Sequence, residues 1–193
     1  MSDTLEVRMV ASADDVLAAL QLRREVFCAE QDVPLDLEID DLDFHPDTCH
    51  VVGLVDGTVV AVGRLTPPEH HIAPDLVPLD LVALGSDGRP TDQTAPVADC
   101  SMSLHVGRLA LRKSSRGLGL GAAMLAGCVR LAGVEWGSDT PLLLELSAQE
   151  YAIGFYERCG FTLIEGRDHY LDAGILHRDM AAVLPPLTHE RRR

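Results

Sequence analysis

A glycine-rich stretch near the middle of the chain has the composition of an anion-binding turn. Residues 116–122 read Arg-Gly-Leu-Gly-Leu-Gly-Ala, with glycine at every second position. Glycine lets the backbone adopt positive φ and approach a ligand closely, because it has no Cβ. Apolar residues recur at helical spacing from Leu120 to Leu131. A helix that begins at this turn would direct unpaired N–H groups and the positive end of its dipole toward a phosphate.

Basic residues gather around the turn although the chain as a whole is acidic. Arg108, Arg112, Lys113 and Arg116 fall close together, whereas the chain has 16 Lys and Arg against 30 Asp and Glu and a formal charge of -14. Local positive charge in a negative chain favours a bound anion. The overall charge argues against nonspecific nucleic-acid binding, which needs a basic face, and is compatible with a cationic partner.

Two other interpretations of the turn remain open at this point. It could simply reverse the chain, because a lone glycine pattern is a weak signal. It could also belong to a Rossmann-type dinucleotide site, since Glu145 follows Gly121 by roughly 20 residues, where a ribose-binding acid would lie. Against this second interpretation, the glycine spacing is G-x-G-x-G rather than G-x-G-x-x-G, and little chain follows to complete a doubly wound sheet.

Apolar periodicity and turn residues predict the elements that must position this stretch. The strongest hairpin signal is Asp56-Gly57 between two β-branched runs. The expected strands are 5–10, 50–55, 58–65, 103–111, 141–146, 161–164 and 175–183. Three helices are expected. The first is capped by Ser12 and ends near Glu30, and the other two begin at Gly119 and at Gln149.

Several segments resemble the GNAT family of N-acetyltransferases. Arg116–Gly121 resembles the family signature Q/R-x-x-G-x-G/A, and Ala152–Phe161 is similar to its later block, in which A-x-x-F/L-Y on a helix is followed by Gly-Phe entering a strand. Further segments resemble the ElaA-like branch: Leu22–Pro34, the acidic run through Asp43, Ser147–Gln149 and Ala173–His177. The resemblance covers most of the chain except residues 67–100 and the tail.

The resemblance implies an α/β (α+β) fold with a mixed, largely antiparallel central sheet flanked by helices. The fourth and fifth strands would splay apart in a V shape. We expect one domain over residues 1–185, with a proline-rich insertion at about 66–100 that is partly ordered at Leu79–Leu84, and a polar tail at 186–193.

By the same resemblance, acetyl-CoA lies in the wedge between the strand segment Leu109–Leu111 and the strand Leu142–Leu146. The pantetheine would pair with the first of these as an added strand, and the pyrophosphate would be held by the glycine turn. Gln149 stands where many relatives carry Asn. The implied cofactor-binding residues are Leu109, Ala110, Leu111, Arg116, Gly117, Leu118, Gly119, Leu120, Gly121, Ala122 and Gln149.

The resemblance further implies that an amine attacks the thioester directly, so that no nucleophilic cysteine is required. Tyr156 occupies the position of the general acid that protonates the departing thiolate; alternatively it is a packing residue. The general base is open, with His105 and Glu145 as candidates. A silent acetyl-CoA-binding sensor or scaffold is the alternative function.

The acidic run allows two interpretations, a solvated loop or an acceptor entrance whose negative potential attracts a protonated amine. On the second, Glu30, Glu38, Asp40 and Asp41 are substrate-binding residues. The acceptor would be a small amine, a polyamine, an amino sugar or a lysine side chain. The oligomeric state is open, a homodimer included.

Cysteine usage and hydropathy favour a cytoplasmic protein that binds no membrane. The five cysteines are odd in number and widely separated, without C-x-x-C, so neither a disulfide framework nor a zinc site is expected. Glu69-His70-His71 is a weak metal pattern, and we expect no metal. Neither a leader with an apolar core nor an apolar run of about 18 residues occurs.

Overall fold

The computed structural model describes residues 4–67, 80–96, 100, 102–137 and 139–186. The chain divides into two compact units, Met1–Thr66 with Val106–Cys128 and Pro67–His105 with Val129–Arg193. Strand β6 (Met102–Leu111) and helix α3 (Leu120–Trp136) each contribute to both units. The Glu69-His70-His71 pattern and the polar tail beyond residue 186 lie outside the described residues.

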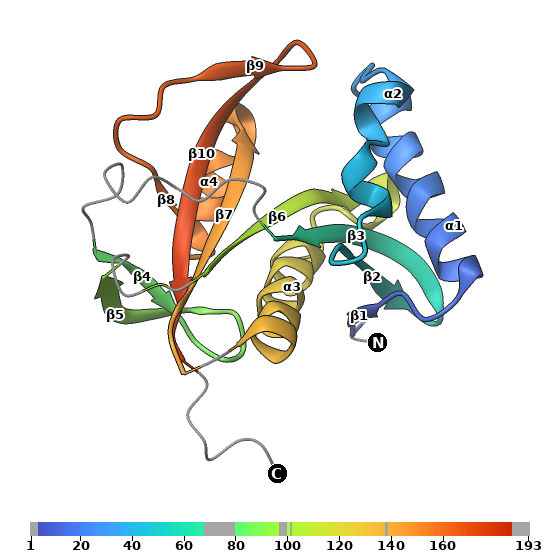
Figure 1. Ribbon diagram of the computed structural model, residues 1–193. Helices are drawn as coiled ribbons and strands as arrows, with labels where there is room; N and C mark the ends of the chain where they lie inside the picture. The colour runs from blue at the N-terminus through green and yellow to red at the C-terminus, as the bar shows by residue number, and fades with distance from the viewer. Residues whose placement is uncertain (1–3, 68–79, 97–99, 101, 138, 187–193) are drawn as a thin grey trace. The chain divides into compact units, whose positions relative to one another are not determined.

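The strands of the first unit follow the order β1, β2, β3 and β6 (Figure 1). β1 (Glu6–Met9) pairs antiparallel with β2 (Cys49–Val55), which forms a hairpin with β3 (Thr58–Thr66). Asp56 and Gly57 have φ values of 49° and 74°, as a two-residue hairpin turn of type I′ requires. The predicted hairpin is therefore confirmed.

Helix α1 (Ala13–Arg23) covers one face of these strands. Ser12 caps it as predicted, because its side chain accepts a hydrogen bond from the Asp15 N–H. The coil then continues as a π-helix, η1 (Arg24–Ala29), which the apolar spacing did not reveal. Buried residues of this helical segment pack against buried residues of β2, β3 and β6 in one core. The helical segment contributes Ala19, Leu22 and Val26, and the strands contribute Val52, Leu54, Val59, Val62 and Ala110.

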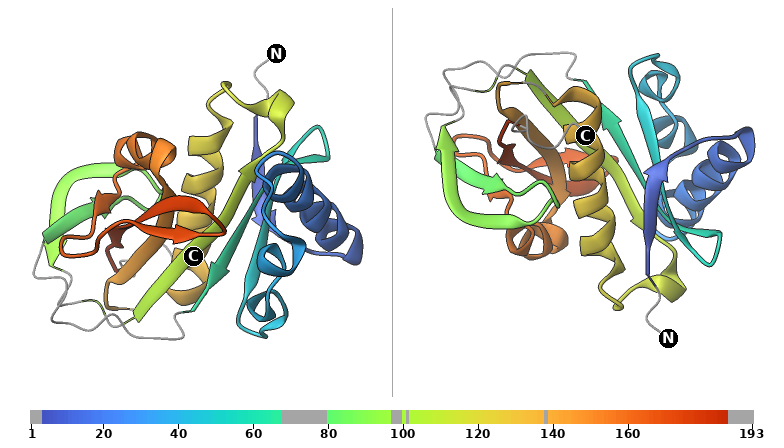
Figure 2. Two further views of the ribbon diagram at one scale, coloured as in Figure 1. Left: turned by 90° about the horizontal axis from the view of Figure 1, so that it is seen from above. Right: turned by 90° about the horizontal axis from the view of Figure 1, so that it is seen from below.

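The first turns of α3 pack on the opposite face of β2 and β3. A Cβ at Gly63 would lie 3.0 Å from Cys128 Sγ, and one at Gly53 would lie 3.0 Å from Met124 Sδ. A Cβ at Gly127 would overlap the side chain of Val7 on β1. Small residues therefore let the helix approach the sheet closely, while α1 lies on its other side (Figure 2).

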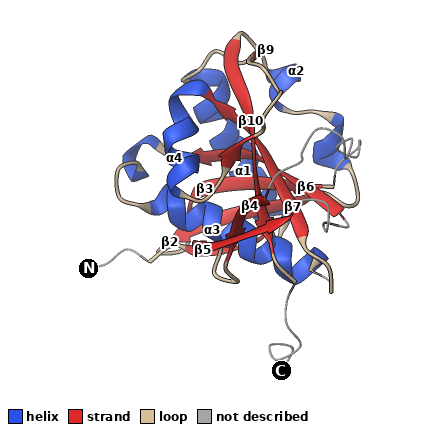
Figure 3. Ribbon diagram, turned by 90° about the vertical axis from the view of Figure 1, so that its left-hand side faces the viewer, coloured by secondary structure: helices blue, strands red, loops and turns tan. Residues whose placement is uncertain are grey.

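The second unit is built around β10 (Ile175–Leu184). β10 pairs antiparallel with β7 (Leu142–Gln149) and in parallel with β4 (Asp80–Leu84). Figure 3 shows its strands in red and helix α4 in blue. β5 (Pro90–Pro96) pairs with β4, and the short strands β8 (Thr162–Leu163) and β9 (Tyr170–Asp172) pair with β10. The 3-10 turn η6 (Glu150–Ala152) and helix α4 (Ile153–Arg158) follow β7.

A parallel ladder joins the first part of β6 to β7. It runs from Met102 opposite Leu142 to His105 opposite Glu145, although β6 continues to Leu111 and β7 to Gln149. The segment β6–α3–β7 is thus a βαβ connection, which explains the local likeness to a dinucleotide-binding unit.

Most of the described ladders are antiparallel, with the β6–β7 and β10–β4 pairs as the parallel ones. This agrees with the predicted mixed, largely antiparallel sheet and contradicts the doubly wound parallel alternative. Part of the predicted insertion is regular, because β4 and β5 form a hairpin within it. Strand β9 was not predicted, since Tyr170–Asp172 is short and mostly exposed. Among the described residues, no helix is both long and apolar enough to cross a membrane.

Candidate functional site

The glycine turn connects β6 to α3 in the first unit. A short 3-10 turn, η5 (Lys113–Ser115), precedes it. Gly117 and Gly119 both have φ of 79°, and a Cβ added at either would meet open space. These glycines are therefore required by backbone conformation rather than by neighbouring protein atoms. α3 begins directly after them, so the N–H groups of its first turn lack intrahelical partners. The turn fits a bound phosphate group.

Arg116 fastens the turn with its side chain. Its Nε and Nη2 donate to the Leu111 carbonyl at 3.0 and 2.9 Å, and Nη1 and Nη2 donate to the Glu30 carboxylate at 2.7 and 3.0 Å. The hydrogen bonds from Arg116 lower the pKa of Glu30. One predicted cofactor-binding residue and one predicted substrate-binding residue thus contact each other, across 86 positions of sequence.

The strand segment before the turn contains a backbone irregularity. Leu109 and Leu111 are partly exposed and Ala110 is buried, as expected for alternating faces. Arg108 has φ of 51° inside β6, whereas the other described non-glycine residues of positive φ lie in turns or a loop: Asp32, Asp56 and Ala173. Such a conformation costs about 1–3 kcal/mol and persists where surrounding contacts hold it.

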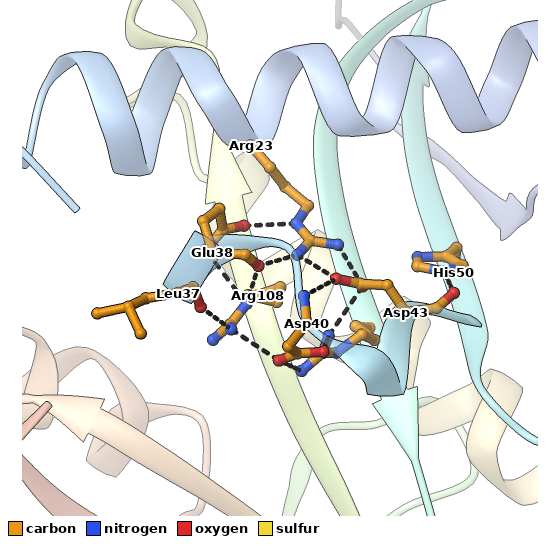
Figure 4. Close-up of polar contacts among 8 residues, drawn as sticks. Arg23, Leu37, Glu38, Asp40, Asp43, His50 and Arg108 are labelled. Atoms are coloured by element: carbon orange, nitrogen blue, oxygen red, sulfur yellow. Dashed lines mark hydrogen bonds and ion pairs between the residues drawn. The ribbon is translucent and has the colours of Figure 1, made fainter. Parts of the chain in front are cut away.

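The acidic run forms an ion-pair network rather than a solvated loop (Figure 4). Arg23 Nη1 lies 2.6 Å from Asp43 Oδ1 and also pairs with Glu38, with all three side chains only 2% exposed. Burial opposes ionisation of Asp43, yet hydrogen bonds from its arginine partners outweigh it and hold its pKa well below the usual range. The network comprises three arginines and three carboxylates: Arg23, Arg64, Arg108, Glu38, Asp40 and Asp43.

The network contains two of the predicted substrate-binding residues. Glu38 and Asp40 use their carboxylates to hold arginines, while Asp41, the third residue predicted from this run, is exposed. The run was expected to be either solvated or substrate-binding, and its role as a set of internal counter-ions was missed. Contact of these residues with an acceptor stays a prediction.

Tyr156 lies on α4 in the second unit, where two aromatic rings hold it. Its ring meets Phe155 and Phe161 edge-on, with centroids 5.0 and 6.3 Å away. The Tyr156 carbonyl also accepts the Phe161 N–H at 3.0 Å, which ties the helix to the chain that follows it. The phenol is partly exposed. The Gly160-Phe161 pair after the helix therefore fixes the orientation of the predicted acid.

A row of polar side chains occupies one face of β7. Glu145, Ser147 and Gln149 are partly exposed and alternate with buried residues. The parallel register places His105 of β6 opposite Glu145, and the antiparallel register places Asp179 of β10 opposite Ser147. The two predicted base candidates are therefore cross-strand neighbours.

Hydrogen bonds connect this row to residues that the sequence did not single out. Asp179 accepts from Ser147 Oγ at 3.2 Å, from Tyr170 Oη at 2.8 Å and from Arg167 Nη1 at 2.9 Å. His105 Nε2 lies 3.5 Å from Ser147 Oγ, at the outer limit for a hydrogen bond. Tyr170 and Asp179 were missed because only the register of β7, β9 and β10 brings them to this row. Arg167 was missed because it lies in the loop between β8 and β9 and reaches the row only through its side chain.

The electrostatics of this row shift the pKa of one carboxyl upward. Burial raises the pKa of Glu145, the nearby Asp179 charge adds to the shift, and Arg167 opposes it. Burial also raises the pKa of Tyr170 to about 12, so its hydroxyl stays protonated and donates to Asp179. Within the described part of the chain, no group of three His, Cys, Asp or Glu side chains is arranged to hold a metal ion.

The fold and the glycine turn agree with those expected of an acyl-CoA-dependent transferase, and comparison with known proteins identifies the family. The model of the acetyltransferase (GNAT) family matches residues 16–161, so the chain belongs to this family, as predicted. The family binds acyl-CoA. The UPF0039 protein sll0451 of Synechocystis sp. is 31% identical over 168 residues, covering 86% of this chain and 85% of that protein.

Two solved structures share the fold over most of the chain. An acyl-CoA N-acyltransferase from Pseudomonas aeruginosa is 28% identical with a TM-score of 0.66, covering 93% of this chain and 99% of that one. ElaA from Escherichia coli is 24% identical with a TM-score of 0.63 and the same coverages. The dinucleotide-binding alternative is therefore withdrawn.

Proposed function

We propose that the protein transfers the acetyl group of acetyl-CoA to a primary amine. The observation that carries the proposal is the glycine turn, in which Gly117 and Gly119 hold a positive φ with open space around them directly before a helix of 17 residues. A pyrophosphate accepts hydrogen bonds from exposed backbone N–H groups of this kind. The family and the Pseudomonas aeruginosa acyltransferase support the use of a CoA thioester.

The remaining cofactor contacts follow from the strand before the turn. Leu109, Ala110 and Leu111 would present backbone groups to the pantetheine amides, in the way an added strand binds. The Leu111 carbonyl is the exception, because it accepts two hydrogen bonds from Arg116. One of these N–H groups would stabilise the oxyanion that forms during attack. Gln149 would contribute a side-chain hydrogen bond. Leu118, Leu120, Gly121 and Ala122 would line the diphosphate through their backbone.

Acetyl-CoA would supply a thioester that an unprotonated amine can attack directly: the C–N bond forms first, and the C–S bond breaks when the oxyanion collapses. The nitrogen gives up a second proton after attack, which would restore the phenol once Tyr156 has protonated the sulfur. Two residues would manage the protons. Tyr156 would donate its phenol proton to the departing sulfur, a role that suits a hydroxyl held in place by Phe155 and Phe161. A base would first remove a proton from the ammonium, because an ammonium has no lone pair for attack.

Glu145 is the better candidate for that base. Its pKa is raised by burial, which brings it nearer to the pH at which a carboxylate accepts protons efficiently. His105, opposite it in the register, would pass the proton on through Ser147, with which it makes a long contact. Asp179 and Arg167 would fix the orientation of this row.

The acceptor is a cationic amine on this proposal, either a small molecule, a polyamine, an amino sugar or a lysine side chain. The net charge of -14 raises the local concentration of cations near the protein. Glu30 and Asp41 would contribute to this potential. We propose no nucleic-acid or membrane partner and no metal.

Calorimetric titration tests the cofactor assignment. The purified protein is titrated separately with acetyl-CoA, a long-chain acyl-CoA, free CoA, NAD and NADP. The proposal expects acetyl-CoA and CoA to bind, the long chain to bind more weakly, and neither dinucleotide to bind. Tighter binding of the long-chain acyl-CoA would mean that the protein transfers an acyl group other than acetyl. Absence of CoA binding would contradict the proposed function.

A further inference from the structure

Arg108 adopts a conformation that arginine disfavours, at a position that precedes the proposed pantetheine strand. Its φ of 51° lies within β6, and the next three residues are Leu109, Ala110 and Leu111. A side chain with a Cβ clashes with its own backbone in this region, so the conformation requires support from elsewhere. The backbone rotation at residue 108 sets the direction in which the following amides point.

The support comes from the short helix α2 (Leu35–Glu38) and the residues after it. Arg108 Nη2 donates to the Leu37 carbonyl at 3.0 Å and Nε donates to the Glu38 carbonyl at 3.1 Å. Nη2 also donates to Asp40 Oδ2 at 3.0 Å. These carbonyls end α2, so one guanidinium holds both the helix end and a carboxylate (Figure 4).

The groups that hold Arg108 are themselves immobilised. Arg23 binds the Glu38 carboxylate and the Glu38 carbonyl, and is 2% exposed. Arg64 donates to both oxygens of Asp40, at 2.6 and 3.0 Å, and is 6% exposed. With Asp43 the network holds three positive and three negative groups, so its charges balance inside the unit. The centre of the network is buried, while Arg108 and Asp40 are partly exposed at its edge. A charge-balanced network with this many hydrogen bonds is rigid.

We infer that this network is a lock on β6, and that Arg108 is a positioning residue for the CoA strand segment Leu109–Leu111. The inference rests on the proposed function, because the locked segment matters for binding only if acetyl-CoA pairs with it. It assigns Glu38 and Asp40 to the cofactor side of the reaction. The acceptor-entrance interpretation assigns the same carboxylates to the amine, so the two make opposite kinetic predictions.

Comparison of Arg108→Ala with Arg108→Gly separates positioning from simple stability. Both variants remove the guanidinium, but only glycine adopts positive φ without a steric clash. The inference expects acetyl-CoA to bind Arg108→Ala at least about tenfold more weakly than the native protein, and Arg108→Gly to recover most of that loss. Equal affinity in both variants, whether native or reduced, would overturn the lock.

Amide hydrogen exchange tests the lock without any ligand. Peptides covering residues 107–112 should exchange several-fold faster in Arg108→Ala than in the native protein, while peptides of β10 keep their native rates. Unchanged exchange across residues 107–112 would refute the inference. If the native protein fails to bind acetyl-CoA but the exchange result holds, the proposed function falls and the lock stands.

Steady-state kinetics of Asp40→Asn distinguishes the two assignments of the acidic run. The lock predicts a KM for acetyl-CoA raised about fivefold or more with the acceptor KM unchanged. The entrance interpretation predicts the reverse, and that result would contradict the lock. Asp36→Asn is the matched control, because Asp36 lies four residues before Asp40 on helix α2, is exposed and has no described contact with the network.

Discussion

On the proposed mechanism, the Tyr156 hydroxyl takes part in the chemical step but not in acetyl-CoA binding. Tyr156→Phe removes the phenol oxygen but keeps the ring that packs against Phe155 and Phe161. We expect kcat to fall by about 10²-fold or more, the usual contribution of a general acid, with acetyl-CoA affinity unchanged by calorimetry. Tyr151→Phe, at a ring 78% exposed, should leave both values unaltered. Full turnover by Tyr156→Phe would eliminate the acid role and leave packing as its function.

Glu145 gives the reaction a predictable pH dependence. A base must be ionised to act, and burial raises the pKa of this carboxyl above its ordinary value. We therefore expect kcat/KM to fall on the acid side with a midpoint higher than that of an ordinary glutamate. Glu145→Gln should lose both this limb and about 10²-fold or more in rate. The exposed control Glu165→Gln should keep the native profile, and an unchanged profile in Glu145→Gln would point to His105.

The same shift predicts how Glu145 affects stability. A pKa raised on folding means that the native state favours the protonated form. Its contribution is fully present below the unfolded pKa and is lost as pH rises through the folded pKa. Glutamine mimics the neutral acid at every pH, so the variant does not lose this contribution. The free energy of unfolding of Glu145→Gln minus that of the native protein should therefore increase as pH rises from the unfolded to the folded pKa of Glu145. Urea unfolding at a series of pH values measures the difference; a constant difference would mean that the carboxyl is not perturbed.

The turn between β6 and α3 is the element on which cofactor binding depends. Gly119→Val places a branched side chain where φ is 79°, with open space around it. We expect Gly119→Val to abolish acetyl-CoA binding. The free energy of unfolding should fall by only about 1–2 kcal/mol, the cost of placing a residue with a Cβ at positive φ. Gly166→Val is the matched control, because Gly166 has φ of 78° and equally open surroundings. Normal affinity in Gly119→Val would refute the anion-binding turn.

Breaking the ion-pair network should destabilise the first unit strongly, because Arg23, Glu38 and Asp43 at its centre are buried. Removing Arg23 leaves Glu38 and Asp43 without their closest partner, and breaking a buried pair costs about 3–5 kcal/mol. Arg23→Met should therefore show this loss in urea unfolding at neutral pH, whereas Arg24→Met, at an exposed neighbour, should not. Since the pKa of Asp43 is lowered, this stabilisation is present above the ordinary aspartate pKa and fades only as pH falls toward the lowered value. A loss below about 1 kcal/mol would show that the network is energetically neutral.

Elements set by local signals were predictable from the sequence. Ser12 caps its own helix, Asp56-Gly57 turns its own hairpin, and the glycines before α3 start that helix. The network and the polar row were not predictable in this way. Arg108 contacts Glu38 across 70 positions, and Ser147 lies beside Asp179 only because β7 and β10 pair in one register. Positive φ at Arg108 has no local signal either, since arginine is not a residue that favours it.

The net charge of the whole molecule should influence which amine acceptors bind well. A formal charge of -14 attracts a dication more strongly than a zwitterion, and salt screens this attraction. With acetyl-CoA saturating, we expect the KM for a diamine to rise several-fold between low and high ionic strength, while the KM for a zwitterionic amino acid stays level. Parallel salt dependence for both acceptors would show that the acidic surface has no part in acceptor choice.

Family membership could be predicted from two short motifs, because the glycine turn and the Tyr156 block keep their order and spacing along the chain. The acceptor could not be predicted. Its contacts depend on side chains that several strands contribute, and the acidic residues that suggested an entrance are partly used as internal counter-ions.

Release of free thiol from acetyl-CoA shows whether this chain catalyses acetyl transfer to an amine. The purified protein is mixed with acetyl-CoA and a panel of polyamines, amino sugars, amino acids and lysine peptides, and free CoA and acetylated amine are measured together. We expect release of CoA that requires one class of amine, yields an equal amount of acetylated product and is lost in Tyr156→Phe. Tight acetyl-CoA binding without release by any amine would exclude the proposed catalysis and identify a silent acetyl-CoA sensor.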